Sequence, residues 1–116
     1  MAVRRSIDEA KKGSAEVVIL AIVEHEAHHG YEIAKLIEQR TGGGLRFTLA
    51  SLYATLYRLE DRGWIKGSWG TSENNRRARF YSLTSAGRKQ FLTEAGRWQR
   101  LVESIARVLG PELTEA

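Results

Sequence analysis

The order of helix-like and strand-like segments is the feature that most restricts the fold of this chain. Apolar residues recur at helical spacing in three consecutive segments, and two short segments with alternating apolar residues follow around a turn-rich stretch. A long segment with helical periodicity comes last. The sequence therefore predicts helices within 14–26, 31–43 and 49–63, strands at 64–70 and 76–84, and a final helix at 85–110.

Polar caps and apolar stripes support these helices. Hydroxyl side chains stand where three of the helices should begin, at Ser14, Thr48 and Thr84. Glycines follow the second and third helices, at 42–44 and 63, and are typical helix stops. In the third helix three leucines fall within a narrow arc that should face the core: Leu52, Leu56 and Leu59.

Three helices followed by a β-hairpin is the element order of a winged helix-turn-helix. The predicted fold class is therefore mainly α (α+β), a winged helix-turn-helix with a long C-terminal dimerisation helix. Residues 1–84 would form the DNA-binding domain, with residues 1–12 as an N-terminal arm or short helix. Residues 85–116 would form the dimerisation helix and a tail.

In this architecture the third helix lies in the DNA major groove. Its face away from the leucines has small and polar side chains, which allow close approach to base edges, and Arg58 is placed for a base or a phosphate. Tyr53 flanks the leucine stripe, where its hydroxyl could reach a phosphate. The predicted DNA-binding residues of this helix and its cap are Thr48, Ala50, Ser51, Tyr53, Ala54, Tyr57 and Arg58.

Arginines are concentrated in the second predicted strand, in the stretch NNRRARFYSLT at 74–84. The net charge of +4 permits an anionic partner, and this local cluster fits a phosphate-facing patch. Arginine at a wing tip suits the DNA backbone or a narrow minor groove, and asparagine tolerates the left-handed turn conformation. The alternative is a solvated strand edge protected by charge. The predicted wing contacts are Asn75, Arg76, Arg77 and Arg79.

The last helix has apolar residues in alternating steps of four and three, the spacing of a coiled-coil seam. A second apolar stripe runs beside it. Two stripes are more than one small core can bury, and this surplus favours pairing with a second copy of the chain. The alternative is a long helix wrapped around its own domain. The predicted dimer-interface residues are Phe91, Ala95, Trp98, Leu101, Val102, Ile105 and Leu109.

Across residues 13–109 the sequence resembles the PadR family of transcriptional regulators. The resemblance rests on the motifs HGYEIAKLIEQRTGG (29–43), SLYATLYRLEDRGWIKGSWGTSENNRRARFYSLTSAGRKQ (51–90) and RWQRLVESIARVL (97–109). It implies a dimeric, DNA-binding repressor of the short branch, with a single C-terminal helix as the dimer interface. It also implies DNA contacts by the third helix and wing, and a groove between subunits that accepts a planar apolar effector.

Other function classes find little support. The chain has no cysteine that could act as a nucleophile and no glycine-rich loop that follows a strand. It also has no recognisable serine, histidine and aspartate motif. We therefore expect no enzyme and no cofactor. His25, His28 and His29 fall at a turn without defined ligand spacing, so no metal site is predicted. The aromatic residues, expected to pack in the core or sheet, are Tyr31, Trp64, Trp69, Phe80 and Tyr81.

Without a signal peptide or an apolar run long enough to span a membrane, a cytoplasmic protein is expected. The sequence therefore predicts a sequence-specific, DNA-binding transcriptional regulator, a homodimeric repressor that occludes a pseudo-palindromic operator. The alternative is a winged-helix protein–protein interaction module that uses the basic wing on an acidic partner.

Overall fold

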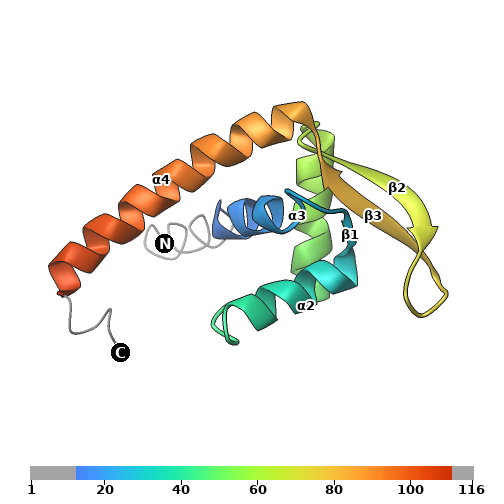
Figure 1. Ribbon diagram of the computed structural model, residues 1–116, viewed down its shortest axis with the longest axis horizontal. Coiled ribbons are helices and arrows are strands. Elements are labelled where there is room, and N and C mark those ends of the chain that lie inside the picture. The colour runs from blue at the N-terminus through green and yellow to red at the C-terminus, as the bar shows by residue number, and fades with distance from the viewer. Residues whose placement is uncertain (1–12, 111–116) are drawn as a thin grey trace, which may run out of the picture.

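The computed structural model describes residues 13–110, so the predicted arm at 1–12 and the end of the tail at 111–116 lie outside the described residues. The described part is a winged helix of four helices and a three-stranded antiparallel sheet (Figure 1), which confirms the predicted fold class. Residues 13–22 are helical. The other elements are β1 (His28–His29), α2 (Gly30–Arg40), α3 (Leu49–Asp61), β2 (Ile65–Thr71), β3 (Arg77–Leu83) and α4 (Ser85–Leu109).

The core lies where the first three helices meet the base of the hairpin. The leucine stripe of α3 is buried as predicted, and Ile33 and Ile37 of α2 are buried with it. The other members of this cluster are Ile19, Leu20, Ile22, Val23, Ile65 and Tyr81. Because burial of apolar area is the main favourable term in folding, this cluster fixes α3 against the base of the hairpin.

Side-chain caps define where the helices begin. The hydroxyl of Thr48 accepts a hydrogen bond from the Ser51 amide at 3.1 Å, and that of Thr84 accepts one from the Gly87 amide at 2.9 Å, as predicted. Ser14 lies within a helix, since Gly13 is already helical, so the prediction that it caps the first helix is wrong.

The sheet has the order β1-β3-β2. The two predicted strands pair from Ile65 opposite Leu83 to Thr71 opposite Arg77. Strand β1 was not predicted, because two residues are too short to show strand periodicity; it pairs with the middle of β3, at Phe80 and Tyr81. At the tip of the hairpin Asn75 has a φ of 59°, the left-handed conformation expected of an asparagine there.

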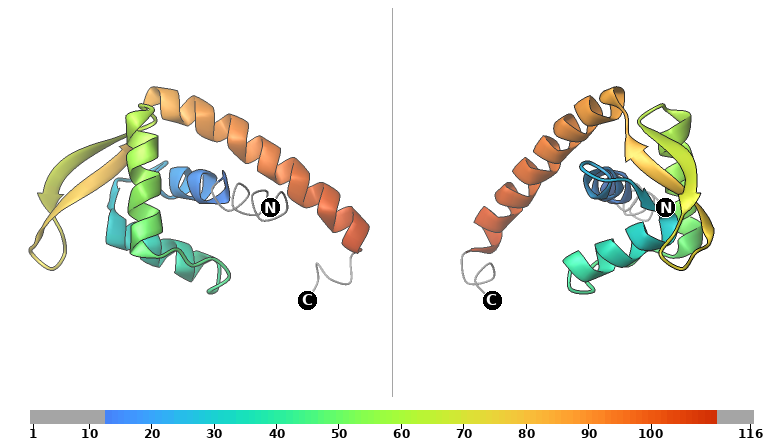
Figure 2. Two further views of the ribbon diagram at one scale, coloured as in Figure 1. Left: turned by 180° about the vertical axis from the view of Figure 1, so that it is seen from behind. Right: turned by 45° about the vertical axis from the view of Figure 1, so that its right-hand side comes forward.

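Helix α4 has 25 residues and is about 37 Å long at a helical rise of about 1.5 Å per residue. Gly87 lies so close to the backbone of Trp64 that a Cβ would collide with the Trp64 carbonyl, and this contact fixes the start of α4 to the base of the hairpin. Figures 1 and 2 show α4 passing along the helical segment 13–22 and extending away from α3 and the wing. Most of α4 therefore lies beside the winged helix and outside its core.

Candidate nucleic-acid interface

The outer face of α3 is exposed and consists mainly of small side chains. Ala50, Ser51 and Ala54 are exposed, as is the cap residue Thr48, and Tyr57 is 58% exposed one turn further on. The predicted contrast between a leucine face and a small, polar face is confirmed. A helix surface of this kind can approach another surface closely without a steric penalty.

Arg58 is an exception on this helix. Its side chain is 32% exposed, its Nε lies 3.6 Å from a carboxylate oxygen of Glu16, and its Nη2 donates to the hydroxyl of buried Thr55 at 3.0 Å. Glu16 also accepts from Arg62 at 3.1 Å. Arg58 therefore has partners within the protein, because its guanidinium turns toward the helical segment 13–22. A contact between Arg58 and DNA stays a prediction.

Tyr53 also packs inward. Its ring lies over Gly30 at the start of α2, where an added Cβ would come within 2.5 Å of the ring and of the hydroxyl. The ring is partly buried against the core, and it lies 6.3 Å from the exposed ring of Tyr57. Gly30 is therefore the residue that lets α2 and α3 approach each other at this point, and Tyr53 joins the two helices.

The wing presents two exposed arginines and one partly exposed arginine that is paired within the protein. Arg76 and Arg77 are exposed, and the Arg77 guanidinium lies over the Trp69 ring. Arg79 instead pairs with Glu60 at the end of α3 and lies 5.7 Å from the centre of the Tyr81 ring. Burial raises the pKa of the Tyr81 phenol, and the charge of Arg79 opposes that rise.

The aromatic residues divide into two groups. Tyr81 is buried in the core, and Trp64 and Phe80 are partly buried, as predicted. Tyr31 is 62% exposed, so the expectation that it packs in the core or sheet is wrong. Trp69 is equally exposed, but its ring lies on the sheet under the Arg77 guanidinium. A solvent-exposed strand can keep a large ring on its surface when a neighbouring side chain covers it, as Arg77 covers Trp69.

A groove of about 820 Å³ separates the wing from α2 and α3. Its walls include Tyr53 and Tyr57 of α3 and the wing arginines, so the structure brings these predicted residues together. The outer face of α3 lines a second groove, of about 580 Å³, with the connector between α2 and α3. The residues that line the first groove but were not predicted to bind DNA include Tyr31, Lys35 and Trp69. Tyr31 and Lys35 lie four residues apart on the exposed side of α2, a spacing that could have revealed them.

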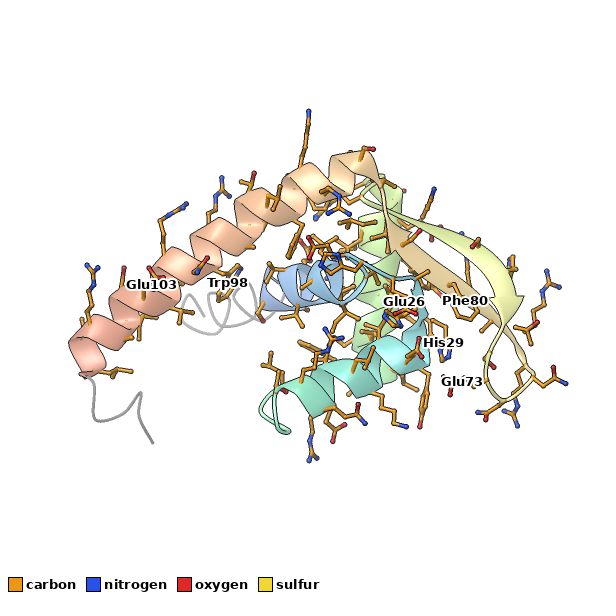
Figure 3. The ribbon with its side chains drawn as sticks, in the orientation of Figure 1. Glu26, His29, Glu73, Phe80, Trp98 and Glu103 are labelled. Atoms are coloured by element: carbon orange, nitrogen blue, oxygen red, sulfur yellow. The ribbon has the colours of Figure 1, made fainter. Side chains whose placement is uncertain are left out.

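The histidines of this region have structural partners. His29 is the N-cap of α2: its Nδ1 accepts from the Glu32 amide at 3.2 Å, and its ring meets Phe80 edge-on at 5.4 Å (Figure 3). His28 contacts the Glu32 carboxylate at 2.5 Å. Within residues 13–110, no group of three or more metal-binding side chains could hold an ion. These contacts connect β1, α2 and the wing.

The sequence profile of the transcriptional regulator PadR-like family matches residues 19–94. The chain belongs to this family. Members of this family are transcriptional regulators, and the winged helix described above is the fold that the family resemblance predicted.

The chain is also similar to individual known proteins. A protein of Lysinibacillus sphaericus, named only as an uncharacterized protein, is 30% identical over 81% of this chain and 86% of its own length. A transcriptional regulator of Clostridium thermocellum has 28% identity and a TM-score of 0.73, over 84% of this chain and 91% of its own. A PadR family transcription regulator of Clostridium difficile has 26% identity and a TM-score of 0.69, over 83% of this chain and 98% of its own.

The fold is also that of Bacillus subtilis PadR, which was solved in complex with operator DNA. That chain is 20% identical and superposes with a TM-score of 0.60, over 67% of this chain and 45% of its own. Among residues 13–110, none of the helices of this PadR-like chain combines the length and apolar character needed to cross a membrane.

The predicted dimer residues of this PadR-like chain fall into two groups along α4. Phe91 packs against the core and Trp98 lies partly buried against Gly13 (Figure 3), so in the single chain both side chains already have contacts, and their place in the interface stays a prediction. Ala95 is also partly buried. The remaining predicted residues are exposed: Leu101 (50%), Val102 (59%), Ile105 (48%) and Leu109 (55%). The C-terminal half of α4 thus presents an apolar surface to solvent.

Proposed function

We propose that the chain is a sequence-specific regulator that binds duplex DNA with α3 in the major groove and the wing on the flanking backbone or minor groove. The observation that supports this best is the exposed small face of α3 beside two exposed arginines, Arg76 and Arg77. The operator complex of Bacillus subtilis PadR, a protein of the same fold, adds support.

The dimensions of α3 fit this role. A helix of 13 residues is about 20 Å long, and the major groove, about 12 Å wide, accepts a helix with small outward side chains. Ser51 can exchange hydrogen bonds with base edges, and Ala50 and Ala54 can contact a thymine methyl. Tyr57 lies toward the groove beside the wing, where its hydroxyl suits a phosphate.

The wing provides charge that is not neutralised within the protein. No ion pair in the described residues involves Arg76 or Arg77, whereas Arg58, Arg62 and Arg79 all pair with glutamates. Lys35 lines the same groove from α2. Cations that are exposed and unpaired release counterions from DNA most readily, so these residues would supply the salt-dependent part of the affinity.

We further propose that the chain acts as a homodimer. The exposed apolar residues of α4 from Leu101 to Leu109 would lose their contact with water in a pair of such helices. A two-fold axis through this interface would present two recognition helices to half-sites about 34 Å apart. The matching DNA site is a pseudo-palindromic operator, and occlusion of a promoter there would repress transcription. A planar apolar effector that bound beside Trp98 would change the angle between the subunits.

Selection from a random pool tests this function directly. The protein is incubated with random-sequence duplexes in about 150 mM salt, and the bound fraction is amplified and sequenced over several rounds. We expect enrichment of a pseudo-palindromic sequence with two half-sites about ten base pairs apart. A pool that stays random after several rounds would contradict the proposal and favour an acidic protein partner for the wing.

A further inference from the structure

Arg79 differs from the other two arginines of the wing in its surroundings. Its Nη2 donates to the carboxylate of Glu60, and its guanidinium lies over the Tyr81 ring. Its Nε is buried without a hydrogen-bond partner, whereas Arg76 and Arg77 are exposed. The charge of Arg79 is thus paired with a carboxylate of the same chain, at the partly exposed junction between α3 and the wing.

A glycine on the neighbouring strand makes room for this side chain. Gly67 pairs with Tyr81, and the Arg79 side chain lies over it, so that a Cβ at residue 67 would collide with the guanidinium. Glycine inside a strand lowers stability and often marks a place where another group approaches closely. Here Glu60 of α3, Gly67 of β2 and Arg79 of β3 together form one contact.

We infer that Arg79 is a positioning residue, and that its pair with Glu60 holds the wing at a fixed angle to α3. A two-stranded ribbon is strongly twisted and is marginally stable alone, so the wing needs a contact beyond its base. Glu60 lies near the end of the recognition helix, and Arg79 lies partway along the wing. The pair therefore sets the separation between the two surfaces proposed to contact DNA.

The consequence for DNA rests on the proposed function. When α3 and the wing bind one duplex together, a wing that is already at the right separation loses less conformational freedom on binding. The pair then contributes to operator affinity without touching DNA. The competing assignment is that Arg79 leaves Glu60 to contact a phosphate, and the two assignments predict opposite effects of removing the Glu60 charge.

The wing angle can be measured without DNA. The chain has no cysteine, so nitroxide labels at Asn74→Cys and Ala50→Cys report the separation of the wing tip from the start of α3. Labelled chains are mixed with excess unlabelled chains, so that only distances within one chain are seen, and the distances are measured by pulsed electron resonance. We expect one narrow distribution, which broadens in Glu60→Gln and also in Gly67→Ala.

These two variants break the same contact in different ways. Gly67→Ala displaces the guanidinium and changes no charge, whereas Glu60→Gln removes the carboxylate and leaves the strand intact. Ser68→Ala, on the exposed side of the same strand, is the matched control and should leave the distribution unchanged. Distributions of unchanged width in both folded variants would overturn the inference.

DNA titrations separate the two assignments of Arg79. On a duplex selected by the unaltered protein, Glu60→Gln and Gly67→Ala should bind about tenfold more weakly, with little change on a scrambled duplex of equal length. Tighter binding of Glu60→Gln to both duplexes, with a steeper salt dependence, would instead make Arg79 a phosphate contact. If no duplex is selected at all, the proposed function fails, and the distance measurement still tests the positioning role.

Discussion

The guanidinium of Arg77 lies 4.7 Å from the centre of the Trp69 ring, across the two strands of the wing. Trp69 is 62% exposed and contributes nothing to the core. An exposed cation–π contact stabilises by about 0.5–1 kcal/mol, enough to favour one position of a long side chain. Arg77 is therefore partly ordered on the surface where we propose that it meets DNA.

The wing arginines should determine much of the salt dependence of DNA binding. The double variant Arg76→Ala with Arg77→Ala should weaken binding to all duplexes alike and lower the slope of log affinity against log salt by about 0.9 per lost phosphate contact. Fluorescence titrations at several salt concentrations measure this slope. Lys89→Ala, an exposed cation on α4, is the control and should leave the slope unchanged. An unchanged slope in the double variant would make the cluster a solvated strand edge.

Ser51 should affect the choice of DNA sequence and not the stability of the fold. Its side chain is exposed on the outer face of α3, so Ser51→Ala should lose about 1–3 kcal/mol of the binding free energy that distinguishes one base pair of the operator. Repeating the selection with this variant should show a relaxed preference at that position. The same preference at every position would mean that α3 does not contact bases through Ser51.

Arg58 should matter for the stability of the fold. Arg58→Ala removes an ion pair with Glu16 and a hydrogen bond to Thr55, and because the side chain is about one-third exposed the loss should be about 1 kcal/mol. Urea unfolding measures this difference. Arg40→Ala, at the exposed end of α2, is the matched control and should change the free energy of unfolding very little. Equal stability of the two variants would contradict the structural role of Arg58.

The Tyr81 phenol should make the fold sensitive to alkaline pH. Burial raises its pKa in the folded state, so the folded protein holds the phenol proton more tightly than the unfolded chain does. This contribution to stability is fully present below about pH 10, the unfolded value, and is lost as the pH rises through the higher folded value. Urea unfolding at a series of pH values from about 9 to about 11 should show a steeper loss for the parent than for Tyr81→Phe. Parallel curves of unfolding free energy against pH for the two proteins would contradict a role of the Tyr81 phenol in this loss.

The exposed half of α4 should hold the dimer together. In Val102→Glu a charge would be buried against apolar side chains of the second copy, at a cost of several kcal/mol, roughly the penalty for desolvating an unpaired charge. Sedimentation should show a folded monomer, since Val102 lies outside the core. Thr93→Glu, an exposed position off the seam, should remain a dimer. A Val102→Glu dimer of unchanged affinity would exclude this interface.

Local patterns in the sequence predicted much of the fold. The leucine stripe of α3, the caps at Thr48 and Thr84 and the left-handed turn residue Asn75 depend on neighbours a few residues away, which the sequence displays directly. Ser14 was misassigned because a hydroxyl before an apolar run marks a helix start only when the residue before it is not helical, and Gly13 is helical.

Contacts between distant segments were not predictable in this way. Arg79 and Glu60 are 19 residues apart, and nothing in the local sequence shows that they meet. Arg58 likewise turns to Glu16, on a different helix. An arginine cluster shows where positive charge is concentrated, but only the packing shows which charges are neutralised. For this reason the sequence assigned three arginines to the wing surface, and the structure leaves two of them unpaired there.

We expect α3 and the wing to bind duplex DNA with sequence preference. A titration of the unaltered protein with the selected duplex and with a scrambled duplex, between about 50 and 200 mM salt, tests it most directly. We expect a steep loss of affinity with salt on both duplexes and a preference of about a thousandfold or more for the selected one at about 150 mM. Equal affinity for the two duplexes, or binding that does not change with salt, would contradict it.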